Sequence, residues 1–121
     1  LAGAAVAFMN AKLVSGIDTI IRETNLDEHL ADADWIITGE GSFDRQSLMG
    51  KVVSGVLNCA RRQNVRLAVI AGQVNIPREQ YRRYGIEIAI SCKKTDMDTS
   101  YAIENCTSLL KSACKVFLRY I

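Results

Sequence analysis

The stretch DWIITGEGSFDRQSLMGK, residues 34–51, decides how this chain folds. Residues 34–38 are mostly apolar and predict a buried strand that ends at Gly39. A polar loop rich in glycine would follow, and apolar residues at helical spacing begin after Lys51. The stretch therefore predicts a strand, a loop that presents polar side chains, and a helix.

Two further apolar runs follow the same plan, at residues 67–71 before Gly72 and at residues 86–90. Continuous apolar runs are typical of strands that are covered on both faces, as in parallel sheets. The predicted helices are 2–13, 17–24, 27–31, 51–63, 77–83 and 98–120. The last is amphipathic, and its apolar stripe consists of Ile103, Cys106, Leu110, Ala113, Phe117 and Ile121. The predicted fold class is α/β, with a partial Rossmann-like parallel sheet of about three strands flanked by helices.

Composition excludes several classes of protein. Of the 121 residues, 49% are hydrophobic and 23% are charged, so a disordered chain is not expected. The formal net charge of +2 predicts neither a nucleic-acid partner nor a membrane surface. No apolar run approaches the roughly 20 residues that a membrane-spanning helix needs. His29, in a polar stretch, is expected at the surface, and Trp35 in the core.

Four cysteines fit none of the CxxC patterns of metal or redox sites. Buried free thiols in a reducing cytosol are the simplest interpretation, which predicts a cytoplasmic location. The cysteines are Cys59, Cys92, Cys106 and Cys114.

The first loop has the residue types of an anion site. Consecutive N–H groups over Gly39, Glu40 and Gly41 could form a concave turn that attracts anions. Ser42 and Ser47 could donate to phosphate oxygens. Gly50 and Lys51 lie where a helix begins, and its free N–H groups favour negative charge.

Two carboxylates in this loop, Glu40 and Asp44, would repel a phosphate unless a cation mediates. Phosphoryl transfer resolves the conflict, because Mg²⁺ bridges phosphates to carboxylates and one carboxylate accepts a hydroxyl proton. Standard phosphate-loop motifs do not fit: Arg45 and Val52 break the Walker A pattern, and Asp44 breaks the GxGxxG pattern.

Each of these residues also has a purely structural alternative. Asp44 could cap a turn or helix, Glu40 could hold the loop, and Lys51 could be a surface lysine. Gln46 and Ser47 could orient substrate or cap the next helix. A second ligand-facing loop is expected at Gly72, Gln73 and Asn75. The pair Lys93-Lys94 follows the third strand and could either be solvated or contact a nucleotide phosphate.

The segment DADWIITGEGSFDRQSLMGK closely resembles the signature of the bacterial glycerate kinases. Members typically have Ala-Asp, hydrophobic residues and Thr-Gly-Glu-Gly, then a hydrophobic residue with Asp, then Gln-Ser/Thr and Gly-Lys. The flanking segments AKLVSGIDTIIRETNLDEHLADAD and VRLAVIAGQV are also similar to the family. The matching residues are Ala33, Asp34, Ile36, Ile37, Thr38, Gly39, Glu40, Gly41, Phe43, Asp44, Gln46, Ser47, Gly50 and Lys51.

The resemblance implies a kinase that transfers the γ-phosphoryl group of ATP, with Mg²⁺, to D-glycerate or a similar small hydroxy acid. It implies that residues 1–121 are the C-terminal portion of a longer enzyme, incomplete and inactive alone. Asp44 and Glu40 would then be catalytic, with Asp44 also linked to Mg²⁺. Phosphate or substrate would bind at Gly39, Gly41, Ser42, Gln46, Ser47, Gly50, Lys51 and Gly72.

Two positions depart from the family pattern. Many members have Arg where this chain has Ser42, so one phosphate or carboxylate contact is absent or comes from elsewhere. Many have Pro where this chain has Val53, a substitution that costs little in a first helical turn. A non-catalytic module that binds a nucleotide or phosphate, or associates with other chains, stays as the alternative. An incomplete sheet also predicts self-association into a homo-oligomer.

Overall fold

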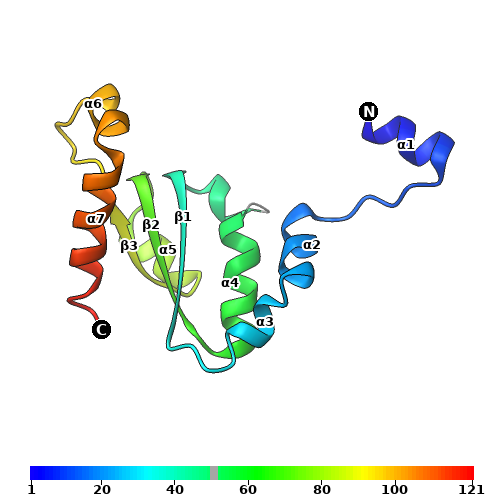
Figure 1. The fold of residues 1–121 in the computed structure, drawn as a ribbon, viewed down its shortest axis with the longest axis horizontal. Coiled ribbons are helices and arrows are strands. Elements are labelled where there is room, and N and C mark those ends of the chain that lie inside the picture. The colour runs from blue at the N-terminus through cyan, green and yellow to red at the C-terminus, as the bar shows by residue number, and fades with distance from the viewer. Residues whose placement is uncertain (50–51) are drawn as a thin grey trace.

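A computed structural model describes residues 1–49 and 52–121, which form a three-stranded parallel sheet with helices on both faces (Figure 1). The strands β1 (Trp35–Phe43), β2 (Arg66–Val74) and β3 (Ile86–Ser91) lie in the order β1-β2-β3. The predicted α/β class and partial Rossmann-like sheet are confirmed. β2 is the central strand, and all of residues 67–71 are buried, as the continuous apolar run predicted.

The prediction that the first strand stops at Gly39 is wrong. β1 continues to Phe43, where it pairs with Val74, and β2 likewise continues past Gly72. The glycines are strand residues because the two backbones approach closely: a Cβ on Gly39 would lie 2.5 Å from the carbonyl oxygen of Ile70. The concave turn expected over Gly39–Gly41 is therefore an extended strand end.

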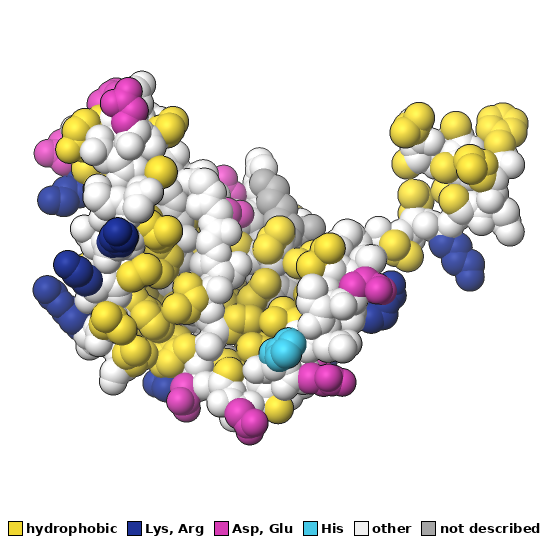
Figure 2. All heavy atoms as spheres, in the orientation of Figure 1, with side chains coloured by type: hydrophobic (Ala, Val, Ile, Leu, Met, Phe, Trp, Pro, Cys, Tyr) yellow, Lys and Arg dark blue, Asp and Glu magenta, His cyan; other side chains and the backbone are white. Residues whose placement is uncertain are grey.

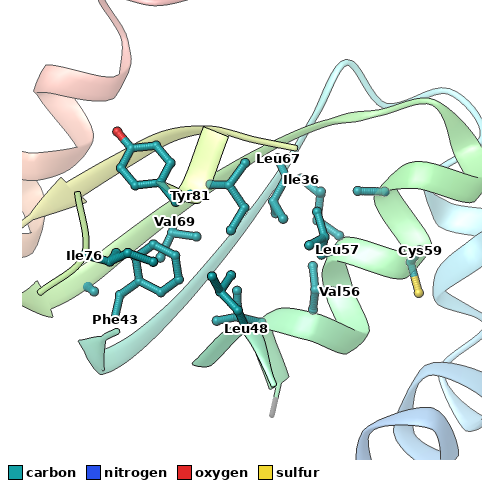
Figure 3. Packing of buried hydrophobic residues seen from close by; sticks show 14 of the residues in the cluster. Ile36, Phe43, Leu48, Val56, Leu57, Cys59, Leu67, Val69, Ile76 and Tyr81 are labelled. Atoms are coloured by element: carbon teal, nitrogen blue, oxygen red, sulfur yellow. The ribbon is translucent and has the colours of Figure 1, made fainter. Parts of the chain in front are cut away.

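One face of the sheet carries the main core. It is covered by α2 (Gly16–Glu23), α3 (Leu26–His29), α4 (Val52–Gln63) and α5 (Arg78–Arg83). Figure 3 shows Phe43, Val69 and Tyr81 converging on this core, with the Phe43 and Tyr81 rings 6.1 Å apart. Asn64 ends α4 with a φ of 56°, the left-handed conformation that Asn tolerates.

The other face is covered by α7 (Cys106–Phe117), which lies opposite α4 in Figure 1. Here the ring of Trp35 meets Phe117 edge to face at 5.2 Å, and Arg66 stacks over Trp35 at 4.3 Å. Trp35, expected in the core, is only partly buried and packs against it, whereas His29 is exposed, as expected.

The single C-terminal helix predicted over residues 98–120 is two helices, α6 (Thr99–Glu104) and α7. Asn105 separates them, with its φ at −103° and its side-chain amide donating to the Tyr101 carbonyl at 3.0 Å. Asn side chains compete with helical backbone bonds in this way. Only Ala113 and Phe117 of the predicted apolar stripe are buried. Ile103 and Leu110 are 68% and 49% exposed.

The N-terminal helix α1 (Ala2–Met9) stands apart from the sheet (Figure 1). It ends four residues before the predicted boundary, at Asn10 in the left-handed conformation, and none of its residues is buried. Figure 2 shows its apolar side chains as an isolated group. Within the described residues, no helix has the length and apolar character required to cross a membrane.

The four cysteines are free thiols, but the expectation that they are buried holds only for Cys59. Cys92 is half-buried, and Cys106 and Cys114, both on α7, are exposed. Burial raises the pKa of the Cys59 thiol, while the neighbouring Arg62 opposes this shift.

Candidate functional site

A tight turn after β1 holds the first group of predicted site residues. The carboxylate of Asp44 accepts from the backbone N–H of Gln46 at 2.8 Å and of Ser47 at 3.2 Å. These bonds start the 3₁₀ helix η1 (Gln46–Leu48). Asp44 thus caps the turn, and the described hydrogen bonds of its carboxylate all use Oδ1.

The side chain of Ser47 stabilises the same turn through hydrogen bonds. Its side chain is fully buried, and its Oγ accepts from the Asp44 N–H at 3.2 Å and donates to the Ser42 carbonyl at 3.3 Å. A buried hydroxyl with these partners stabilises the turn rather than projecting from it. Gln46 is exposed beside it.

Ser42 and Asn75 join the ends of β1 and β2. The Asn75 side-chain amide donates to Ser42 Oγ at 3.0 Å, and the Asn75 N–H donates to the Phe43 carbonyl at 2.7 Å. The two loops that the sequence placed at one edge of the sheet are therefore in contact. Gly50 and Lys51, also predicted as site residues, lie outside the described residues.

Glu40 lies on the α4 side of β1. It pairs with Ala71, whose side chain belongs to the core beneath α4, and strand alternation gives both residues the same face. One carboxylate oxygen of Glu40, Oε1, is buried without a hydrogen-bond partner among the described residues. Buried polar atoms are normally satisfied, so this oxygen has an unused capacity for a ligand.

Glu40 and Asp44 suit a hard cation by type, since Mg²⁺ binds oxygen ligands and commonly uses one or two carboxylates together with substrate phosphates. The unpartnered Oε1 of Glu40 fits that role. Among the residues that the structure describes, no group of three or more His, Cys, Asp or Glu side chains could hold a metal ion. A metal here would need substrate oxygens or further residues.

A groove of about 610 Å³ opens on the other face of the sheet, beneath α6 and the first part of α7. The backbone of Gly39, Gly41 and Gly72 lines its floor, and Ala102, Ile103, Cys106, Thr107 and Leu110 line its helical wall. Figure 1 shows α6 near the carboxyl ends of the strands, where ligands of open α/β sheets bind.

Lys93, which follows β3, also lines this groove. Its N–H donates to the Gly72 carbonyl at 2.8 Å, and the Ser91 hydroxyl donates to the Lys93 carbonyl at 2.7 Å. Neighbouring Cys92 also lines the groove, and burial raises the pKa of its thiol, with Cys114 adding to the shift. Cys92 is therefore a neutral thiol at neutral pH.

The predicted site residues thus fall on two sides of one sheet edge. Glu40 lies on the α4 side with the Asp44 turn beyond the strand end, whereas the three glycines line the groove on the α7 side. The sequence pattern does not predict the groove wall, because it places Ile103 and Leu110 on the apolar stripe of one continuous helix. The available signal was Asn105, which interrupts an otherwise regular helical pattern.

Comparison with known proteins identifies the family. The profile of the glycerate kinase family matches residues 1–121. A glycerate kinase of Halalkalibacterium halodurans is 36% identical over 91% of this chain and 29% of its own length. The glycerate 2-kinase of Escherichia coli is 37% identical over 75% of this chain and 24% of its own length.

A solved structure agrees with these relatives. The crystal structure assigned to glycerate kinase 2 of Salmonella typhimurium is 30% identical and superposes with a TM-score of 0.64. The superposition covers 99% of this chain and 32% of that protein. This chain therefore spans between about a quarter and a third of the length of these relatives. With a family match over its full length, the chain belongs to the glycerate kinase family.

Proposed function

We propose that residues 1–121 are the C-terminal portion of a glycerate kinase whose complete form transfers the γ-phosphoryl group of ATP to D-glycerate or a similar small hydroxy acid. The observation that supports this function is the family match over the whole chain. The relatives that carry the name glycerate kinase support the same reaction class. We also propose a cytoplasmic location, which the free thiols favour.

In this reaction the hydroxyl oxygen of glycerate attacks the γ-phosphorus, and the bond to the β–γ bridging oxygen breaks to release ADP. The hydroxyl proton passes to a carboxylate, for which we propose Asp44 through Oδ2, because Oδ1 is used in the turn. Glu40 is the second proposed catalytic carboxylate. With Asp44 it would hold Mg²⁺, which would neutralise phosphate charge when bound.

The remaining predicted residues have binding roles in this proposal. Ser42 and Gln46 are accessible beside the turn and would contact phosphate or glycerate. Ser47 would act indirectly, by holding the turn. Gly39, Gly41 and Gly72 would let a ligand approach the backbone closely. Gly50 and Lys51 would receive phosphate at the start of the next helix.

The test is a coupled assay for ADP release by the complete protein, with ATP and D-glycerate each omitted in turn. We expect release only when both are present, and none from the 121-residue chain alone. A complete protein that releases no ADP with glycerate would contradict the proposed reaction. Turnover by the 121-residue chain would instead show that this portion suffices.

A second function is favoured by α1, whose apolar side chains have no buried contact within the described residues. In the absence of the rest of the enzyme, this helix would associate with another copy of the chain as a non-catalytic module. Light scattering of the chain tests it. We expect a mass that rises with concentration, and a monomer at all concentrations would exclude this function.

A further inference from the structure

We infer that the groove between the glycine-lined end of the sheet and helices α6 and α7 binds the adenine ring of ATP, and that Lys93, which lines this groove, contacts one of the phosphates. This inference rests on the proposed function, and it assigns the nucleotide, rather than glycerate, to the α7 side of the sheet.

The floor of the groove suits a flat ring. Gly39, Gly41 and Gly72 expose backbone without side chains, and a Cβ on Gly41 would meet no atom within 4 Å. An aromatic ring can therefore lie directly against the peptide planes. A glycine floor allows a closer approach than any other residue would.

The wall of the groove is apolar and has no other described partner. Ala102, Ile103, Cys106 and Leu110 line it. The side chains of Ile103 and Leu110 are 68% and 49% exposed. Further along the same apolar stripe, Ala113 and Phe117 pack on the sheet. Ligand sites are mostly apolar concavities with a few polar groups, and ~300–1,000 Å³ is their usual size. The groove, at about 610 Å³, lies within that range.

The charges of the lining residues indicate which of the two substrates of the proposed reaction the groove binds. Among the described residues that line the groove, only Glu40 and Lys93 are charged, and strand alternation directs Glu40 to the opposite face. Glycerate is small and polar throughout, so apolar walls would desolvate it without compensation. A nucleotide combines an apolar ring with an anionic tail, and Lys93 supplies a cation among the residues that line the groove.

The test uses the complete protein and replaces Thr107, an exposed wall residue, with Trp to fill the groove. Ser112→Trp is the matched control, because Ser112 is an exposed hydroxyl residue of the same helix that does not line the groove. The measurements are KM for ATP, KM for D-glycerate, and inhibition by adenosine and by inorganic tripolyphosphate.

For Thr107→Trp we expect KM for ATP to rise at least tenfold and adenosine inhibition to disappear. KM for glycerate and inhibition by tripolyphosphate should stay within twofold of wild type, and Ser112→Trp should change nothing. Lys93→Gln provides an independent measurement: it should weaken ATP and tripolyphosphate several-fold and leave adenosine unchanged.

Three results would overturn the inference. Thr107→Trp could fold and keep its KM for ATP, it could change KM for glycerate alone, or it could change only the oligomeric mass. If Thr107→Trp does not fold, an unchanged affinity of Lys93→Gln for ATP would overturn it. If wild type releases no ADP with glycerate, the proposed reaction fails, and calorimetric titration of the same variants with adenosine and ATP still tests the groove.

Discussion

The carbonyl oxygen of Gly41 occupies the space that a side chain on Gly72 would need. A Cβ on Gly72 would lie 2.5 Å from that oxygen, whereas a Cβ on Gly41 would meet no atom within 4 Å. The two glycines belong to neighbouring parallel strands and look equivalent in the sequence. In the structure, Gly72 is required by the close approach of two backbones, whereas Gly41 faces an open groove.

We therefore expect Gly72→Ala to be destabilising and Gly41→Ala to be nearly neutral for folding. Backbone must move to accept the methyl group at Gly72, and overpacking of this kind costs about 1–3 kcal/mol. Urea unfolding of the two variants beside wild type measures the difference. Equal stability of the variants would show that the β1 and β2 ends can separate freely.

Much of the fold follows from local sequence signals. Continuous apolar runs predicted all three strands, and the central strand β2 is buried over residues 67–71, as such a run indicates. The helix predicted over residues 51–63 ends at the predicted residue, because Asn64 follows it with a positive φ. These signals are local, so a single sequence contains them.

The errors arose where long-range packing decides the structure. Gly39 reads as a turn residue in isolation, yet the strand continues because Ile70 comes too close for any side chain there. Apolar spacing continues across Asn105, although the backbone turns there to form the groove wall. For the candidate site, the sequence placed the two loops at one edge but could not show that Ser47 is buried.

Another glycine, Gly55 of α4, lies where α4 contacts α2. A Cβ on Gly55 would overlap the side chain of Ile17, so Gly55→Ala should displace α2. Alanine gains about 0.5–1 kcal/mol of helix propensity, but overpacking costs about 1–3 kcal/mol, so net destabilisation is expected.

A double-mutant cycle tests this contact. Ile17→Ala removes the obstructing side chain, so Gly55→Ala should be neutral or stabilising in that background. Gly16→Ala is the control, because its Cβ would meet nothing within 4 Å. Additive effects of Gly55→Ala and Ile17→Ala would show that the two helices are not in direct contact at this point.

Acid should loosen α6 before the sheet. Backbone N–H groups of Tyr101 and Ser100 bind the Asp98 carboxylate and hold its pKa below the ordinary value of 3.8. Because the folded pKa is depressed, this cap contributes stability above pH ~4 and loses it as the pH falls through the folded pKa. Hydrogen exchange of α6 amides should therefore accelerate below pH ~4 relative to β2 amides.

Asp98→Ala supplies the control for the pH experiment. It should expose α6 amides at neutral pH and remove their additional pH dependence, because the titrating group is gone. Asp98→Asn should protect α6 at all pH values, since its amide oxygen can still accept from Ser100 and Tyr101. If α6 of Asp98→Asn loosened in acid as wild type does, another group would be responsible.

Two variants of Asp44 can distinguish its structural role in the turn from a role in catalysis. Its Oδ1 accepts from Gln46 and Ser47, and the amide oxygen of Asn can accept the same bonds. Asp44→Asn in the complete enzyme should therefore fold with nearly wild-type stability, whereas Asp44→Ala should lose about 0.5–2 kcal/mol because the cap is gone. Thermal unfolding of both variants measures this structural part.

The catalytic part is measured by kcat of the same two variants. If Asp44 accepts the glycerate proton, both should lose about 10²–10⁴-fold in kcat, because neither Asn nor Ala can take up the proton. If Asp44 only caps the turn, Asp44→Asn should keep most of its activity and Asp44→Ala should lose activity in proportion to its instability. The ratio of kcat between Asn and Ala thus decides whether this carboxylate is catalytic or holds the turn.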